Sequence, residues 1–296
     1  MKIPPLHRIS EAIIHRIGFM LPDKLYLELL FGAHMGYDIN FKRGSTFNEK
    51  LQWLKLYNRR PEYTRLVDKI EVKQWVADKI GNKHIIPTYK IWERPEDIVL
   101  DEIPDQFVLK CNHTGGNAAV FIVDDKSKFD LPSARQSLRR AMRSSIYRNY
   151  REWPYKNVKR RIFAEKMLGT GIEDFKFFCY DGFVESVMVA YERNTGSAKF
   201  YFFDKDWNLK RYNIRGKEAP ADFTKPRPKN LDKMFEIAST LSKGLPFVRV
   251  DLYNIDGQIY FGEMTFFPAS GLDEKLLPET DDYFGSLIKL PSKKIK

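Results

Sequence analysis

The sequence predicts an α+β fold, with antiparallel sheets that carry helices on one face and follow a mainly helical N-terminal region. Two observations predict it: residues 1–80 have mainly helical patterns, and β-rich runs joined by short turns follow from residue 84. Consecutive strands connected by tight turns pair antiparallel, and such sheets commonly bury only one face. A chain of 296 residues with 43% hydrophobic content is long enough for a substantial core.

The individual elements follow from periodicity and turn residues. Helices are expected at 48–58, at 68–81 with Gly81 as the stop, at 131–161, and at 230–244. Strands are expected at 85–92, 106–112, 118–123, 161–167, 174–180, 183–192 and 198–204. Only the letters HTGGN separate the second and third strands, so these two are expected to form a hairpin.

Charge and cysteine content limit the classes of partner and compartment. The chain carries 50 Lys and Arg against 39 Asp and Glu, a net charge of +11, which favours an anionic ligand, polymer or membrane surface. Its two cysteines, Cys111 and Cys179, lie in apolar runs, so a reducing, cytoplasmic interior is expected and a disulfide framework is not.

A membrane-spanning segment is not expected, because no run approaches the roughly 20 apolar residues that a span needs. The stretch from Ile9 to Met20 fits an amphipathic helix that rests on a membrane or a partner. Helices of this kind more often pack on their own domain, and that is the favoured interpretation. The expected localisation is cytoplasmic, with at most a peripheral contact at the inner face of the membrane.

The stretch FVRVDLYNIDGQIYFGEMTFFP, residues 247–268, predicts a second hairpin whose register can be argued. A turn of Asp256 and Gly257 alone would place Val250 opposite Glu263, burying a charge beside an apolar side chain. Moving the register by one residue makes one face consistently apolar or small, with the pairs Val248–Phe266, Val250–Met264 and Leu252–Gly262. That shift is expected to require a loop of three or five residues.

The other face of this hairpin then carries the charges. Asp251 lies opposite Glu263, and Arg249 lies opposite Thr265. Two facing carboxylates repel each other unless a cation lies between them, and Mg²⁺ is commonly held by one or two carboxylates together with phosphates. The alternative is a surface hairpin with screened ion pairs.

Three further segments are candidates for a phosphate or nucleotide site. Lys110 interrupts an apolar strand and precedes a loop of His113, Thr114, Gly115, Gly116 and Asn117, whose glycines would let backbone N–H groups approach a phosphate. This loop is not a Walker A motif, and glycine-containing hairpin loops are common. Glu165 with Lys166, and Asp174 with Lys176, lie in two other strands; each pair alone also fits the polar face of a half-exposed strand.

Taken in order, these segments resemble the TupA-like ATP-grasp family, which is named for a protein of teichuronopeptide synthesis and occurs in gene clusters for cell-surface polysaccharides. The resemblance covers residue 47 to the end and is carried by LVDK, DQFVLKCNHTGG, REWPYKN, AEKML, DFKFFCYDG, PFVRVDLYN and IYFGEMTFFPASG. It implies an ATP-grasp fold, in which two α+β lobes with antiparallel sheets clasp ATP. The implied divisions are a helical region at 1–82, a small lobe at 83–164 and a large lobe at 165–296.

The resemblance also implies roles for individual residues. Lys69 and Lys110 would contact ATP phosphates, and residues 113–117 would form the loop that closes over them. The hinge that meets adenine and ribose would be Glu165, Lys166, Met167 and Leu168. Asp251 and Glu263 would bind Mg²⁺, with Arg249 and Lys176 as catalytic cations. Thr265 stands where many ATP-grasp enzymes have Asn, a stronger ligand for a second Mg²⁺.

The implied reaction is ATP-dependent ligation of a carboxylate to an amine through an acyl phosphate, with ADP as product. The expected substrates are a uronic acid of a bacterial surface polysaccharide or its precursor, and an amino acid or other amine. A basic and aromatic segment at 137–161 fits such an acceptor, and the candidate acceptor residues are Arg148, Arg151, Trp153 and Arg193. A solvated basic helix is the alternative, and a nucleic-acid partner is not expected.

Two other functions fit parts of the sequence. A glycosyltransferase would use Asp204 and Asp206 in DKDWN to hold a metal and a sugar diphosphate, although such a run is more often a hairpin turn. A non-catalytic module that binds polyanions would use the net positive charge and show steep salt dependence. The binding module does not explain why Asp251 would face Glu263.

Overall fold

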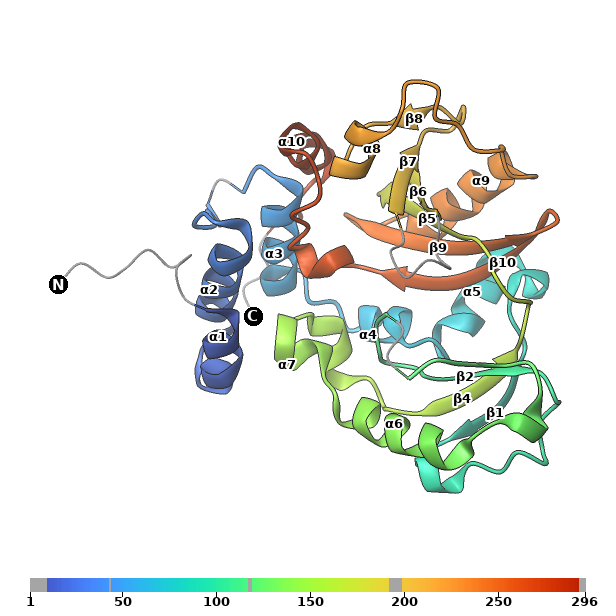
Figure 1. Cartoon of the computed structure of the whole chain (residues 1–296). Coiled ribbons are helices and arrows are strands. Elements are labelled where there is room, and N and C mark those ends of the chain that lie inside the picture. The colour runs from blue at the N-terminus through green and yellow to red at the C-terminus, as the bar shows by residue number, and fades with distance from the viewer. Residues whose placement is uncertain (1–9, 43, 117–118, 192–198, 293–296) are drawn as a thin grey trace.

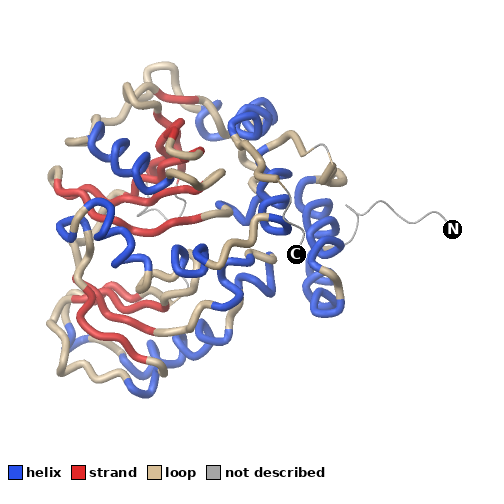
Figure 2. The backbone as a smooth tube through the Cα atoms, turned by 180° about the vertical axis from the view of Figure 1, so that it is seen from behind, coloured by secondary structure: helices blue, strands red, loops and turns tan. Residues whose placement is uncertain are grey.

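The computed structural model describes residues 10–42, 44–116, 119–191 and 199–292. Two sheets form two lobes with helices α4 and α5 between them, and the N-terminal helices α1 and α2 lie along one side (Figure 1). The view from behind shows the same arrangement (Figure 2). Every strand pair is antiparallel, so the α+β fold with antiparallel sheets is confirmed.

The helices and strands of the described chain have the following bounds. The α-helices are α1 (Glu11–Ile17), α2 (Asp23–Met35), α3 (Phe47–Tyr57), α4 (Glu62–Val67), α5 (Val72–Ile80), α6 (Leu131–Arg143), α7 (Ile146–Tyr150), α8 (Ile214–Glu218), α9 (Leu231–Ser242) and α10 (Pro278–Leu287). The strands are β1 (Thr88–Trp92), β2 (Phe107–Cys111), β3 (Phe121–Val123), β4 (Ile162–Lys166), β5 (Asp174–Tyr180), β6 (Phe183–Tyr191), β7 (Lys199–Phe203), β8 (Leu209–Lys210), β9 (Val248–Ile255) and β10 (Gln258–Thr265).

The small lobe is a four-stranded sheet in the order β1-β4-β2-β3. One face buries a core with α6, to which β2 contributes Phe107, Leu109 and Cys111 and α6 contributes Leu138. Because side chains alternate along a strand, Lys110 points to the opposite face. The predicted β2–β3 hairpin is confirmed, but β3 starts only at Phe121, so the connecting loop is longer than HTGGN.

The large lobe is a six-stranded sheet in the order β10-β9-β5-β6-β7-β8, with α9 packed on β5, β6 and β9. Its core also takes in side chains from the helices that precede the small lobe, including Phe47, Leu51, Tyr63 and Val76. Helices α1 and α2 form a separate cluster around Tyr26 and Phe31. Residues 1–82 therefore contain two helix groups with different packing partners.

The helix predicted at 131–161 is wrong in its length. Helix α6 ends at Arg143, two extended serines follow, and the short α7 ends where Arg151 adopts a left-handed conformation with φ of 54°. The hydroxyl of Ser145 accepts a hydrogen bond from the backbone N–H of Arg148 and so begins a new helix instead of continuing the old one. The break turns the REWPYKN segment back toward the lobe interface.

The β9–β10 hairpin confirms the predicted pairing of Asp251 with Glu263, but the loop prediction is wrong. The turn has only two residues, Asp256 and Gly257, which both have positive φ, as a type I′ turn requires. The register shift lies instead in a β-bulge at Gly262, so Leu252 pairs with Phe261 and not with Gly262.

Glycine is required at this bulge because of its surroundings. A Cβ atom at Gly262 would lie 3.0 Å from the backbone oxygen of Asp251 and 3.2 Å from the ring of Tyr253. A small residue therefore sits beside the two carboxylates, and the bulge itself brings them into register.

The two cysteines are buried and unbonded, as predicted. Across the residues that the structure describes, none of the helices combines the length and the apolar character needed to cross a bilayer. Helix α1 is shorter than the predicted amphipathic stretch, and Ile14 is its buried side chain.

Candidate active site

The centre of the candidate site is the carboxylate pair of the β9–β10 hairpin. Asp251 is buried and receives two hydrogen bonds of 2.7 Å from the guanidinium of Arg249, and Lys176 Nζ lies 2.6 Å from its Oδ2. Lys69 Nζ lies 2.9 Å from Glu263 Oε2. Three cations thus balance the repulsion that the sequence predicted between Asp251 and Glu263.

This surplus of positive charge acts on the protonation of Glu263. Burial alone raises the pKa of a carboxyl group, but Lys69, Arg249 and Lys176 outweigh it and hold the pKa of Glu263 well below its ordinary value. Glu263 is therefore ionised throughout the neutral range, and so is available as a ligand.

Lys176 reaches Asp251 from the neighbouring strand, because β5 pairs with β9 in the register that puts Lys176 opposite Asp251. Its Nζ also contacts Asp174, two residues before it on the same strand. Burial lowers the pKa of Lys176, but Asp251 and Asp174 outweigh that effect and the pKa is raised. Lys176 is thus a fixed positive charge beside the carboxylates.

The oxygen ligands of Asp251 and Glu263 fit Mg²⁺ if waters and substrate phosphates complete its coordination shell. Among the residues with described positions, no group of three or more His, Cys, Asp or Glu side chains could hold a metal ion by itself. Mg²⁺ is usually bound by one or two carboxylates, with waters and substrate phosphates completing the shell. Asp251 and Glu263 fit that pattern, and the Thr265 hydroxyl, which donates to Glu263 Oε1 at 3.1 Å, lies next to them.

The small lobe contributes a second buried carboxylate, Glu165 on β4. Lys110 Nζ lies 2.5 Å from its Oε1, and Lys73 Nζ lies 2.7 Å from its Oε2. Burial raises the pKa of Glu165, but the two lysines lower it by a larger amount, so the pKa of Glu165 lies below its ordinary value. Glu165 thus holds the phosphate-binding candidate Lys110 in place.

Lys73 was missed by the sequence analysis. It donates hydrogen bonds to the Ile86 carbonyl at 2.8 Å and the Thr88 hydroxyl at 2.7 Å, in addition to Glu165. The only signal in the sequence is its position four residues after Lys69, on one face of the helix predicted at 68–81. In the structure that helix begins only at Val72, so Lys69 precedes it. A lysine in a short polar helix otherwise resembles a surface residue.

The glycine loop lies next to this group. Lys69 Nζ donates a 2.9 Å hydrogen bond to the carbonyl of Thr114, so Lys69 links the loop of the small lobe to Glu263 of the large lobe. Gly115 and Gly116 are exposed, and Gly116 has a φ of 61°. Asn117 lies outside the described residues.

His113 anchors the base of this loop. The side chain is buried, and Nε2 lies 3.2 Å from the carbonyl of Ala141, which can only accept a hydrogen bond. Burial lowers the pKa of His113 to about 4, and the charge of Arg160 lowers it as well. The ring is therefore neutral at pH 7 and donates its Nε2–H to α6.

This shift predicts an acid-sensitive stability. In the unfolded chain His113 takes up a proton below about pH 6.5, whereas in the folded protein it does so only near pH 4, so stability is lost as the pH falls through this window. We expect His113→Gln, whose amide can still donate to Ala141, to remove about 3 kcal/mol of that loss. Urea unfolding at pH 7 and pH 4.5 measures it, and parallel pH dependence in both proteins would contradict it.

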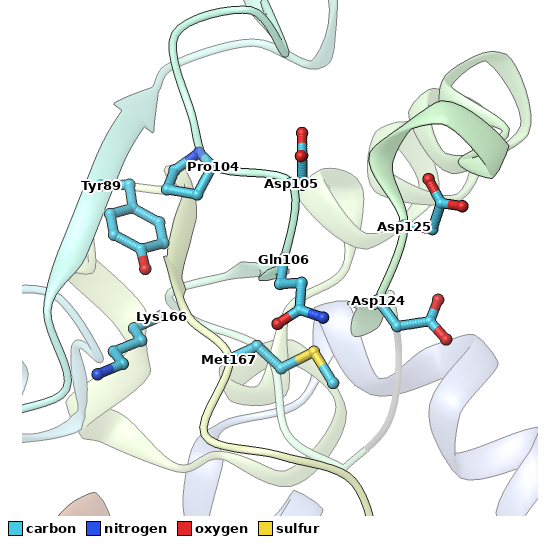
Figure 3. A pocket seen from close by; sticks show the side chains of 8 residues that line it. All are labelled: Tyr89, Pro104, Asp105, Gln106, Asp124, Asp125, Lys166 and Met167. Carbon is cyan, nitrogen blue, oxygen red and sulfur yellow. The ribbon is translucent and has the colours of Figure 1, made fainter.

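The hinge candidates follow Glu165 directly. The backbone N–H of Lys166 donates to the carbonyl of Pro87 at 2.9 Å, and Met167 and Leu168 are half-buried. Lys166 and Met167 also line an open pocket of about 600 Å³ at one end of the small sheet (Figure 3). Its other lining residues are Tyr89, Pro104, Asp105, Gln106, Asp124 and Asp125. Two of the hinge candidates thus line this pocket, whereas Lys73 and Lys110, which contact Glu165, do not.

Arg151 does not fit the predicted acceptor role. It is buried, its Nε lies 3.0 Å from Asp23, and its guanidinium stacks 3.9 Å above the ring of Tyr26. It therefore fastens α7 to the N-terminal helices. Arg148 is exposed and Trp153 half-buried, and Arg193 lies outside the described residues.

A buried acid, Glu152, was also missed. It accepts a 2.7 Å hydrogen bond from the Ser270 hydroxyl, and the Ser270 carbonyl accepts one of 2.7 Å from the fully buried Lys55. Burial raises the pKa of Glu152 to about 7 and lowers that of Lys55 to about 8. This pair fixes the turn after β10, in which Ala269 and Ser270 both have positive φ.

Asp204, the candidate of the glycosyltransferase alternative, caps a turn. Its Oδ1 accepts a hydrogen bond of 2.8 Å from the backbone N–H of Asn208, between the paired strands β7 and β8. This is the turn interpretation that the sequence favoured.

Comparisons with known proteins agree with the predicted family. The family model described as TupA-like ATPgrasp matches residues 49–289. A search of curated proteins gave no significant match.

Several solved structures are similar at low identity. The D-alanine–D-alanine ligase from Helicobacter pylori is 15% identical with a TM-score of 0.49, over 84% of this chain and 70% of that one. The D-alanine–D-alanine ligase from Bacillus anthracis is 17% identical with a TM-score of 0.43, over 82% and 68%. The ATP-grasp ligase PsnB, complexed with minimal precursor, Mg and ADP, is 12% identical with a TM-score of 0.43, over 95% and 75%.

The family model covers both lobes, from α3 into the last residues after α10. The chain therefore belongs to the TupA-like ATP-grasp family and has the ATP-grasp fold.

Proposed function

We propose that this protein is an ATP-dependent carboxylate–amine ligase that forms an amide through an acyl phosphate and releases ADP. The observation that carries the proposal is the facing pair of Asp251 and Glu263 on the large lobe, surrounded by Lys69, Lys176 and Arg249. Ionised carboxylates beside an excess of cations suit a metal–polyphosphate complex, which needs oxygen ligands for the metal and positive charge for the phosphates.

The reaction would proceed in two balanced steps. A carboxylate oxygen of the substrate attacks the γ-phosphorus of ATP, the bond to the β–γ bridging oxygen breaks, and ADP leaves. The amine nitrogen then attacks the acyl carbon, the bond to the phosphate oxygen breaks, and an amide, inorganic phosphate and a proton result. Phosphoryl transfer of this kind asks the protein mainly for positioning and charge neutralisation.

The described residues divide these tasks. Mg²⁺, when held by Asp251 and Glu263, with Thr265 beside them, would supply positive charge to the phosphates. Lys69 and Lys110, each paired with a carboxylate in the structure, would exchange that partner for phosphate oxygens when ATP binds. Arg249 and Lys176 stay protonated and would orient the transferred group and the attacking carboxylate.

In this proposal the adenine base of ATP binds at the hinge. Residues 165–168 would meet adenine and ribose, and the loop at 113–117 would close over the phosphates. The glycines there allow backbone N–H groups to approach phosphate oxygens, and closure would exclude water from the acyl phosphate.

For the substrates, we propose a uronic acid of a bacterial surface polysaccharide or its precursor, joined to an amino acid or other amine in the cytoplasm. The net charge of +11 supports an anionic substrate. Arg148 and Trp153 remain the candidates for acceptor binding, because Arg151 is used in the fold.

Product analysis tests the proposal. The protein is incubated with Mg²⁺, ATP, hydroxylamine and a panel of uronic acids and amino acids, and ADP, AMP and hydroxamate are measured. ADP together with hydroxamate is expected, because hydroxylamine traps an acyl phosphate. AMP would indicate adenylation and contradict the mechanism. UDP release from a UDP-sugar without ATP turnover would favour a glycosyltransferase, and salt-dependent polyanion binding without turnover would favour a binding module.

A further inference from the structure

Exposed apolar side chains are concentrated at the N-terminal end of the described chain. Twelve large hydrophobic side chains are exposed among the described residues, and five of them fall within thirteen consecutive positions. We call these five the N-terminal apolar patch: Ile13, Ile17, Phe19, Met20 and Leu25. Single exposed hydrophobic residues are ordinary on soluble proteins, but a concentration of this kind marks an interaction surface.

The local structure explains why these side chains are exposed. Ile13 and Ile17 are four residues apart and lie on one face of α1, whereas Ile14 on another face is buried. Phe19 and Met20 follow in a single 3₁₀ turn and are 79% and 72% exposed. A phenylalanine and a methionine exposed to this extent contribute little to the packing of this fold.

The patch lies on an outer side of the molecule. Helices α1 and α2 form the outermost layer there, beyond α3, and both opposite views agree (Figures 1 and 2). Their inner sides form the small cluster around Tyr26 and Phe31 and the contacts with Arg151. The segment thus lies away from the two sheets, and its five patch side chains are exposed among the described residues.

Charged side chains of both signs lie around the patch. The acidic side chains of this segment are paired: Glu11 with His15 and His34, and Asp23 with Arg59 and Arg151. Two basic side chains, Arg16 and Lys24, are exposed among the apolar ones, and Lys24 lies 3.7 Å from Glu28 on its own helix. The exposed cations Arg16 and Lys24 thus belong to a chain whose net charge is +11.

We propose that the N-terminal apolar patch docks on the surface of an anionic lipid bilayer, with Phe19 and Met20 inserted among the headgroups and Arg16 and Lys24 in contact with lipid phosphates. An exposed apolar strip beside basic residues is the pattern of interfacial membrane segments, which gain affinity from both apolar burial and anionic lipid. A second copy of this chain fits less well, because two chains that each carry a net charge of +11 repel each other. This inference does not depend on the proposed ligase activity.

Vesicle sedimentation tests the proposal with the full chain. Wild-type protein, the double variant Phe19→Ser/Met20→Ser and the control Phe183→Ser are mixed with phosphatidylcholine vesicles that contain or lack phosphatidylglycerol. Phe183 is 56% exposed at the start of β6 in the large lobe, so its replacement removes a similar exposed aromatic ring elsewhere. Circular dichroism and thermal unfolding establish that all three proteins are folded.

We expect wild type and Phe183→Ser to bind the anionic vesicles, to bind the neutral ones weakly, and to dissociate at high salt. The double variant is expected to lose at least about tenfold in partitioning, from the lost apolar contact alone. Equal binding of the double variant, or no binding of wild type, would overturn the proposal. So would a dimer in analytical ultracentrifugation that the double variant converts to monomer, because the patch would then belong to a second copy.

Discussion

Replacing Glu263 with glutamine is expected to lower Mg²⁺-dependent ATP turnover at least about a thousandfold, the scale of losing a charge that acts on the transferred phosphate. The substitution keeps the size of the side chain and removes one of the two facing carboxylates. Asp251 alone cannot replace it, because its oxygens already accept three hydrogen bonds from Arg249 and Lys176.

The fold is expected to tolerate this change. Lys69 keeps its hydrogen bond to the carbonyl of Thr114, and Arg249 keeps both bonds to Asp251, so no buried cation is left without a partner. A loss of about 1 kcal/mol in unfolding free energy is expected.

Asp256→Asn is the matched control, since it removes the same charge from the same hairpin at the turn, where asparagine also accepts the positive φ. Both variants are compared by ADP release as a function of Mg²⁺ concentration. Retention of more than a tenth of the wild-type rate by Glu263→Gln would remove Glu263 from the metal site.

The facing carboxylates could be predicted from the sequence because the hydrophobic pattern of a hairpin has only two possible registers. Val250 and Met264 must share the buried face, and this requirement alone puts Asp251 opposite Glu263. How the backbone achieves the register could not be predicted, since a longer loop and a bulge at Gly262 satisfy the same pattern.

Contacts between distant parts of the chain were harder to predict. Lys73 and Glu165 are separated by 92 residues, and no local pattern distinguishes a lysine that binds a buried glutamate from one that faces water. Arg151 looked like a ligand for an anion because its binding partner, Asp23, lies far away in an N-terminal helix. Glu152 and Lys55 are likewise brought together only by the turn at Ser270.

The proposed phosphate ligand can be distinguished from a lysine that supports the fold by comparing Lys110→Met with Lys73→Met. Each variant removes one of the two lysines on Glu165, and the two side chains are almost equally buried, at 15% and 16% exposure. Lys110 sits on β2 next to the glycine loop, whereas Lys73 is fixed by two additional acceptors, Ile86 and Thr88.

The two substitutions are therefore expected to have opposite effects on stability and on ATP turnover. Lys110→Met leaves Glu165 paired with Lys73, so we expect a loss of about 1–2 kcal/mol in stability and at least a hundredfold loss in ATP turnover. Lys73→Met leaves two further acceptors without their donor, so we expect a loss of about 3 kcal/mol or more in stability and a smaller loss in turnover. Urea unfolding and ADP release, measured on the same preparations at saturating Mg²⁺, give both values.

The stability and turnover of the two variants together decide which lysine is the phosphate ligand. If Lys73→Met abolishes turnover while it remains folded, Lys73 and not Lys110 is the phosphate ligand, and Lys110 only neutralises Glu165. If both variants lose stability equally and turnover equally, Glu165 needs both charges to keep its position on the small sheet. The predicted outcome, a stable and inactive Lys110→Met beside an unstable and active Lys73→Met, follows from the number of acceptors that each ammonium group serves in the structure.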